Sequence, residues 1–222
     1  MGTRAHLLDR LPGFSALLRI AGWQDLRAMN SLPPGIERQR RARRATGRLE
    51  RAWAARDHRK RADPEIRQFA WLLEASMIAP AAYEAGDLDK AARYASDVMQ
   101  IPTVAQRGGA PSHVDWGRRE RYGAHIVLGK VALRKGDVNA AEYHLVEATD
   151  ASMSSSALFK TSVPDTELAE ELLKLGKVDS VVAYLDALRR LWPSQEPRLD
   201  EWLSEIRDGR VPDFTGWRFR RT

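Results

Sequence analysis

The chain has 222 residues, of which 43% are apolar and 30% are charged, a balance typical of a globular protein with a buried core. It contains no cysteine, which excludes disulfides, thiolate metal sites and cysteine nucleophiles and fits a reducing, cytoplasmic location. The first 20 residues lack the continuous apolar core of a signal peptide, and no run approaches the roughly 18 apolar residues of a membrane span, so no membrane association is expected.

The formal net charge of +6 is concentrated in one segment. Between Arg38 and Arg61 there are eleven basic and two acidic residues, so this segment carries +9 and the rest of the chain −3. Its densest part is a candidate basic patch of four residues: Arg40, Arg41, Arg43 and Arg44. Such a patch could neutralise phosphates or an acidic protein surface, or it could be a solvated helix face; both interpretations stay open.

Apolar residues at helical spacing predict three helices in the N-terminal part, at residues 5–10, 15–29 and 36–62. The prolines and glycine of the run from Ser31 to Gly35 separate the last two. The third helix carries a narrow apolar stripe among its arginines, made of Ala42, Ala45, Leu49, Ala52 and Trp53. Together these helices predict an N-terminal helical extension, residues 1–63.

Three helical hairpins are predicted next, at residues 65–100, 122–150 and 165–191. They turn at Gly86, Gly136 and Gly176, because glycine is the residue best suited to a left-handed helix end, and Asp137 can cap the helix that follows. A long loop is expected before the second hairpin, with Trp116 in it.

The C-terminal part is predicted to hold a short helix at 200–207, ended by Gly209, and an irregular tail at 211–222. Trp217 and Phe219 of this tail are expected to pack onto the last helices. No segment alternates with the period of a strand, so the chain is predicted to be all-α.

The three turn glycines mark an internal repeat. Seven residues before each lies a small residue, Ala79, Gly129 or Ala169, which lets paired helices approach closely. The run LGKVALRKGDVNAAEYHLVEA has the strongest pattern. On these residues, the region 66–192 resembles the tetratricopeptide repeat, although its turn glycines are 50 and 40 residues apart rather than about 34. The C-terminal half, including DEWLSEIRDGRVPDF, resembles small bacterial tetratricopeptide-like proteins of unestablished activity.

The resemblance implies a right-handed α-solenoid of three tetratricopeptide-like hairpins. Its domains would be the N-terminal extension 1–63, the repeats 64–192, and a C-terminal capping helix with an aromatic-basic tail, 193–222. It further implies a non-catalytic scaffold that binds a protein or peptide in a concave groove. Homo-oligomerisation stays open.

In such a stack the residues two, three and six before each turn glycine are expected to be exposed in the groove. Among them are five candidate binding residues: Tyr83, Lys130, Arg134, Glu170 and Lys174. Lys130, Arg134 and Lys174 are predicted to converge, with Tyr83 beside them. Converging cations suit the carboxylates of an acidic peptide or protein.

Two other functions are weighed against the scaffold. A helical enzyme or substrate-binding protein of a bacterial biosynthetic pathway would use residues near the long loop, namely His113, Asp115, Trp116, Tyr122 and His125. Of these, Trp116 and His125 are the candidate ligand contacts. No HExxH pattern, nucleophile elbow or phosphate-binding loop supports catalysis, so no catalytic residue, metal or cofactor is assigned. A nucleic-acid-associated regulator that uses the basic patch is the less favoured third function.

Overall fold

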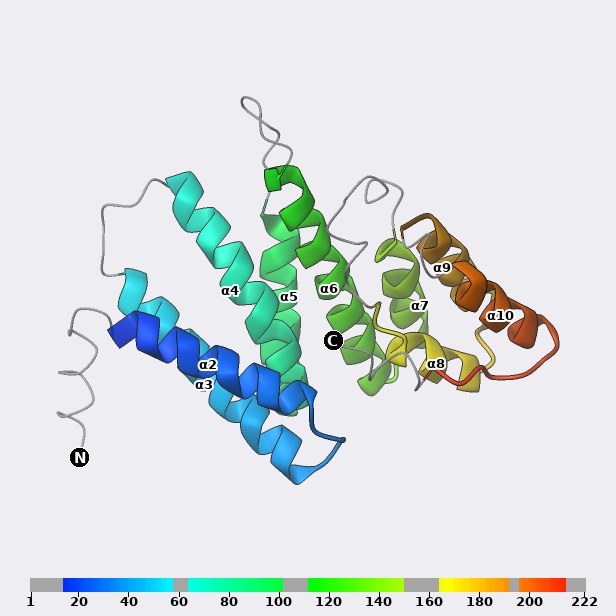
Figure 1. The fold of residues 1–222 in the computed structure, drawn as a ribbon, viewed down its shortest axis with the longest axis horizontal. Helices are drawn as coiled ribbons and strands as arrows, with labels where there is room; N and C mark the ends of the chain where they lie inside the picture. Colours follow the sequence, from blue (N-terminus) through cyan, green and yellow to red (C-terminus); the bar gives the residue numbers. More distant parts are fainter. Residues whose placement is uncertain (1–13, 58–63, 102–111, 150–163, 192–195, 215–222) are drawn as a thin grey trace. The chain divides into compact units, whose positions relative to one another are not determined.

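The computed structural model describes residues 14–57, 64–101, 112–149, 164–191 and 196–214. Throughout these ranges the regular elements are α-helices without any strand (Figure 1), which confirms the all-α prediction. The chain divides into two compact units, Met1–Ile101 and Pro102–Thr222, which are described separately below.

Unit 1 consists of consecutive helices that pack in chain order. They are α2 (Phe14–Asn30), α3 (Ile36–Asp57), α4 (Pro64–Glu84) and α5 (Leu88–Gln100). Helix α2 packs along α3, α3 packs on α4, and α4 pairs with α5. These bounds confirm the predicted helices within one or two residues, except that α3 is described only to Asp57. The predicted helix at 5–10 lies outside the described residues.

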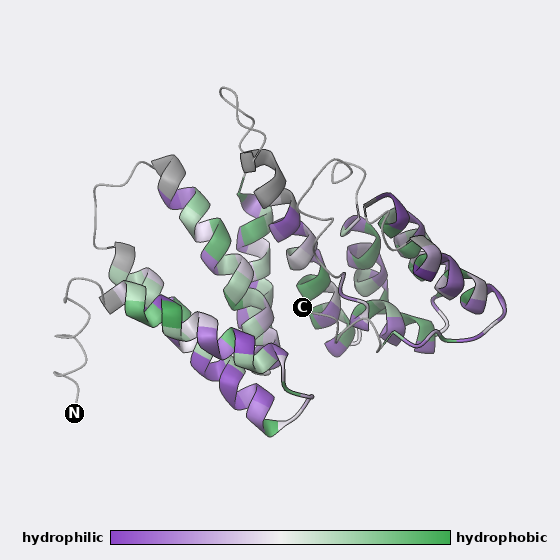
Figure 2. Cartoon of the chain, viewed as in Figure 1, coloured by the Kyte–Doolittle hydropathy of each residue, from purple (hydrophilic) through white to green (hydrophobic). Residues whose placement is uncertain are grey.

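The basic helix α3 is held in unit 1 by its apolar stripe. Ala42, Ala45, Leu49 and Ala52 are each at most 3% exposed, as predicted, and Trp53 is half-buried. A Cβ atom on Gly22 of α2 would lie 2.9 Å from Leu49, so the absence of a side chain there lets the two helices approach closely. In Figure 2 most of the first half of α3 has the colour of hydrophilic residues.

Unit 2 contains the remaining helices. They are α6 (Ser112–Arg134), α7 (Val138–Glu147), α8 (Glu167–Lys174), α9 (Val178–Leu191) and α10 (Glu196–Arg207). Helix α6 pairs with α7, α8 with α9, and α10 packs on α9. The prediction that Trp116 lies in a loop is wrong, because α6 already begins at Ser112. Between Pro111 and Tyr122 the only helix breaker is Gly117, and one glycine is tolerated inside a helix.

The turns of all three predicted hairpins are built alike. Gly86, Gly136 and Gly176 have φ values of 83°, 82° and 75°, in the left-handed region that glycine adopts without strain. At each turn the residue after the glycine donates its N–H to a carbonyl five residues back, at 2.9–3.0 Å. This pattern satisfies the last carbonyls of the first helix. The side chains of Asp87 and Asp137 then cap the next helix at 3.1 and 2.9 Å, which confirms Asp137 as a cap.

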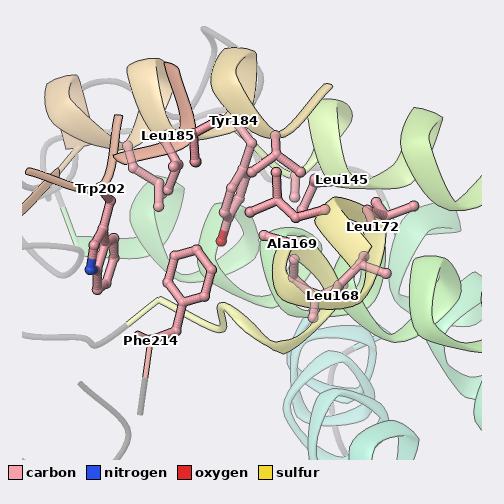
Figure 3. Packing of buried hydrophobic residues seen from close by; sticks show 14 of the residues in the cluster. Leu145, Leu168, Ala169, Leu172, Tyr184, Leu185, Trp202 and Phe214 are labelled. Carbon is pink, nitrogen blue, oxygen red and sulfur yellow. The ribbon is translucent and has the colours of Figure 1, made fainter. Parts of the chain in front are cut away.

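The core of unit 2 is formed by residues of all its helices (Figure 3). Its largest members include Tyr184, Leu145, Leu168 and Leu172, each fully buried. Phe214, in the segment that follows α10, is 1% exposed and stacks edge-on against Trp202 with 4.7 Å between ring centroids. The predicted packing of Trp217 and Phe219 lies outside the described residues.

The small residues of the repeat are buried, as helix crossing requires. Ala79 and Ala169 are at most 1% exposed, and a Cβ atom on Gly129 would overlap Leu168. The right-handed solenoid and the boundaries at 63 and 192 stay predictions.

Candidate binding surfaces

Lys130 is buried, with 6% of its surface exposed, so the predicted exposure of this side chain in a groove is wrong. Its Nζ atom donates to Asp165 Oδ2 at 2.7 Å and to Glu167 Oε2 at 2.9 Å. A buried ammonium is tolerated only when it is paired, and these carboxylates at the start of α8 supply the pairing. Lys130 therefore joins α6 to α8, and a carboxylate ligand would have to displace one of its partners.

The electrostatics of this cluster keep Lys130 protonated. Burial by itself lowers the pKa of Lys130, but Asp165 and Glu167 more than offset it, and the pKa lies above its ordinary value. A lysine that stays charged at neutral pH is an ion-pair partner rather than a base or nucleophile.

Two tyrosines complete the anchor of the segment before α8. Tyr184 Oη donates to the Asp165 carbonyl at 2.8 Å, and the Asp165 N–H donates to Tyr122 Oη at 3.0 Å. The two hydroxyl oxygens are 2.8 Å apart, and because the Tyr184 proton is already engaged, Tyr122 is the donor between them. The three bonds form a closed ring, and burial raises the pKa of both phenols. Tyr122, which the enzyme alternative would use near the long loop, therefore positions α8.

Arg134 and Lys174, the other two predicted cations, are exposed at the C-terminal ends of α6 and α8. The Nζ atom of Lys174 lies 2.7 Å from Glu170 Oε1, one helical turn away, and its side chain is 58% exposed. Exposed pairs of this kind contribute little to stability. Both cations are thus accessible to a partner, and their binding role stays a prediction.

In unit 1 the corresponding position is covered by the basic helix. Glu84, two residues before Gly86, accepts two hydrogen bonds of 2.7 Å from the Arg38 guanidinium. Tyr83 beside it is partly exposed. Because Tyr83 belongs to unit 1, its predicted place beside the cations of unit 2 stays a prediction.

His125 is buried, 8% exposed, and paired with His144 of α7. Their Nδ1 atoms are 3.1 Å apart, so one ring donates a proton and the other accepts it through a lone pair. Burial lowers the pKa of His144. The side chains of His113, Asp115 and Trp116 lie outside the described residues. Within the part that is described, no three potential metal ligands gather.

Glu120 of α6 is a titratable group that the sequence did not indicate. Burial raises its pKa to about 7, only partly opposed by its own backbone and by Arg119. Its Oε2 atom is buried without a hydrogen-bond partner in the described part of the chain. A carboxyl that titrates near neutrality suits proton transfer, but desolvation alone accounts for this shift. In the sequence, the charged run from Arg118 to Arg121 is typical of a solvated helix face, so it does not indicate a buried carboxyl group.

Within the predicted basic patch, Arg41 and Arg43 hold the helices of unit 1 together. Arg41 Nη1 lies 3.3 Å from Asp25 Oδ1, and Arg43 donates to the Ala85 carbonyl at 3.3 Å. The buried Asp25 also binds Arg48 at 2.6 Å. These contacts join α3 to α2 on one side and to the end of α4 on the other.

The other two members of the patch point outward. Arg40 and Arg44 have side chains that are 69% and 49% exposed, and each lies within 4 Å of Glu37. They remain available to an anionic partner. Two arginines of the patch therefore hold helices together, and the other two are exposed.

Helix α2 has an exposed apolar face that was not predicted from the sequence pattern. Leu17, Ile20 and Trp23 are 66%, 56% and 49% exposed, and we call these three residues the α2 stripe. In contrast, Met29 on the other face is 3% exposed. The sequence alone did not separate the two faces, because apolar residues occur on both.

Comparisons of the chain with family models, with curated proteins and with solved structures gave no match. The resemblance to tetratricopeptide repeats therefore stays a prediction from the sequence pattern. None of the helices in the described ranges has the length and apolar character needed to cross a membrane.

Proposed function

We propose that this chain is a non-catalytic scaffold that binds a protein or peptide partner on the surfaces of its helical hairpins. The observation that carries the proposal is the repeated construction of α4/α5, α6/α7 and α8/α9, each closed by the same glycine turn. Repeated hairpins present side chains from a rigid frame, an arrangement suited to extended partners.

In unit 2 the proposed contact residues are Arg134, Lys174 and Glu170. The two cations are exposed, and they can form charge-assisted hydrogen bonds to a carboxylate of a partner. Lys130 has a supporting role, because its two ion pairs hold α8 against α6.

The test is a quantitative co-purification from the native cell with three versions of the full chain. They are the wild type, the double variant Arg134→Ala/Lys174→Ala, and the control Arg207→Ala/Arg210→Ala. The control also removes two exposed cations of unit 2. Removal of a hydrogen bond to a charged group costs about 1.5–3 kcal/mol, so each substitution should weaken binding by roughly 10- to 150-fold.

A partner that is retained by the wild type and the control but lost by Arg134→Ala/Lys174→Ala supports the proposal. Equal retention by all three would place the site elsewhere. Retention of nucleic acid alone would favour the nucleic-acid function, through the basic patch.

A further inference from the structure

The α2 stripe is a compact apolar surface. Its three side chains are spaced three residues apart, so neighbours lie one above the other along about 9 Å of helix. With exposed fractions of 66%, 56% and 49%, each of the three residues keeps about half or more of its surface in contact with water. Grouped apolar side chains of this kind mark interaction sites more often than single exposed ones do.

The stripe lies opposite the face by which α2 is held in unit 1. Gly22, Asp25 and Met29 are buried against α3, and Ile20 lies about 180° around the helix from them. The internal packing of unit 1 therefore uses the other face of α2 and leaves the stripe open to a partner.

The surroundings of the stripe are positively charged. Residues 14–57 contain ten arginines and four carboxylates, a formal charge of +6. Two buried acids are already paired: Asp25 with Arg41 and Arg48, and Glu74 with Arg19. Arg27 is exposed one turn beyond Trp23, and α3, which packs along α2, also exposes Arg44 and Arg51.

We propose that the α2 stripe docks an amphipathic helix of a partner protein whose apolar anchors are flanked by acidic residues. The inference rests on the binding function proposed above and adds a surface and a partner class to it. Apolar anchors three or four residues apart on the partner helix match the spacing of the stripe. Carboxylates that flank these anchors complement the exposed arginines of α2 and α3.

A second copy of the chain fits this surface poorly. Paired α2 stripes would bring two arginine-rich surfaces together, and the repulsion between like charges opposes such a dimer. A lipid surface also fits poorly, because the rest of the outward face of α2, including Gln24, Arg27 and Asn30, is polar. Helices that lie in a membrane interface use an apolar face that continues along their length.

The test is a selection from an unbiased library of displayed peptides, long enough to form about four helical turns, with the full chain as bait. The counter-bait is Ile20→Ser/Trp23→Ser. The control is Tyr143→Ser/Val146→Ser, which removes two apolar residues of unit 2 that are 57% and 39% exposed. Because all four positions are exposed, each variant is expected to fold, which circular dichroism checks.

We expect enriched peptides with apolar residues at helical spacing and an excess of acidic residues. They should bind the wild type and the control equally and Ile20→Ser/Trp23→Ser at least about tenfold more weakly. Arg44→Ala/Arg51→Ala should reduce the salt dependence of binding.

Five results would overturn the inference. The first is peptides that bind the counter-bait as well as the wild type, and the second is enriched peptides that are neutral or basic. The third is a dimer in ultracentrifugation that Ile20→Ser/Trp23→Ser abolishes, and the fourth is stripe-dependent binding to phosphatidylserine vesicles. Peptides lost only with Arg134→Ala/Lys174→Ala would overturn this inference and leave the proposed function standing.

Discussion

The Lys130 cluster in unit 2 and the arginines of α3 in unit 1 use positive charge in opposite ways. One lysine, 6% exposed, holds two carboxylates at 2.7 and 2.9 Å and joins two helices. On α3, by contrast, Arg40 and Arg44 share the single carboxylate of Glu37 at 3.9 and 3.4 Å and remain largely exposed. The number of charges in a segment therefore does not indicate how much stability those charges provide.

The difference comes from solvation. An exposed arginine exchanges its ion pair for water at almost no cost, whereas a buried ammonium whose partners are removed, or carboxylates that lose their cation, cannot be solvated as well. Three substitution experiments sharpen this comparison.

The largest effect is expected for Lys130→Met. This change removes the Lys130 ammonium from Asp165 and Glu167, and it should destabilise the chain by about 2–4 kcal/mol. The value is below that of a fully buried pair because the carboxylate side chains are 39% and 35% exposed. Urea unfolding followed by circular dichroism measures it.

The matched control is Lys174→Met, which breaks an exposed pair with Glu170 on α8. It should change stability by no more than about 0.5 kcal/mol. If Lys130→Met and Lys174→Met have equal effects, the contrast between buried and exposed charge is wrong for this chain.

An intermediate effect is expected from pH, with two opposing contributions in α6 and α7. Burial lowers the pKa of His144 in the folded chain. As the pH falls, the unfolded chain therefore binds a proton at this residue before the folded chain does, and stability falls below about pH 6.5. Burial raises the pKa of Glu120 from 4.5 to about 7, so the folded chain retains this proton longer. Its contribution to stability therefore falls as the pH rises from about 4.5 to about 7.

The variants His144→Asn and Glu120→Gln separate these contributions. We expect His144→Asn to lose less stability than the wild type between about pH 6.5 and pH 5. Glu120→Gln should instead lose less as the pH rises to about 7. Unfolding free energies measured across this pH range check both expectations. If a variant keeps the wild-type pH profile of stability, the residue that it replaces does not contribute to the pH dependence.

The smallest effect is expected for Arg40→Ala/Arg44→Ala. Both side chains are exposed, so the unfolding free energy should change by no more than about 0.5 kcal/mol. The change should also shrink at high salt because the charges are screened. A loss of more than about 2 kcal/mol would show that these arginines are structural, like Arg38 and Arg48.

The local structure was largely predictable because its signals are local. Gly86, Gly136 and Gly176 end helices through their own backbone freedom, and Asp137 caps the next helix three residues on. The narrow stripe of α3, from Ala42 to Ala52, follows from its periodicity. The start of α6 was misplaced because the glycine-proline run at 108–111 suggested a loop that continues to Tyr122, whereas the helix already begins at Ser112.

The all-helical character of the chain, the positions of its glycine turns and the uneven distribution of charge could be predicted from the sequence, since these depend on residues a few positions apart. Which charges are buried follows only from the packing of the helices. Lys130 and Lys174 look alike in the sequence. Lys130, however, is buried and paired with carboxylates at the start of α8, whereas Lys174 is exposed. The reason is that burial depends on residues 35 and 37 positions away, Asp165 and Glu167, which helix packing alone brings to Lys130.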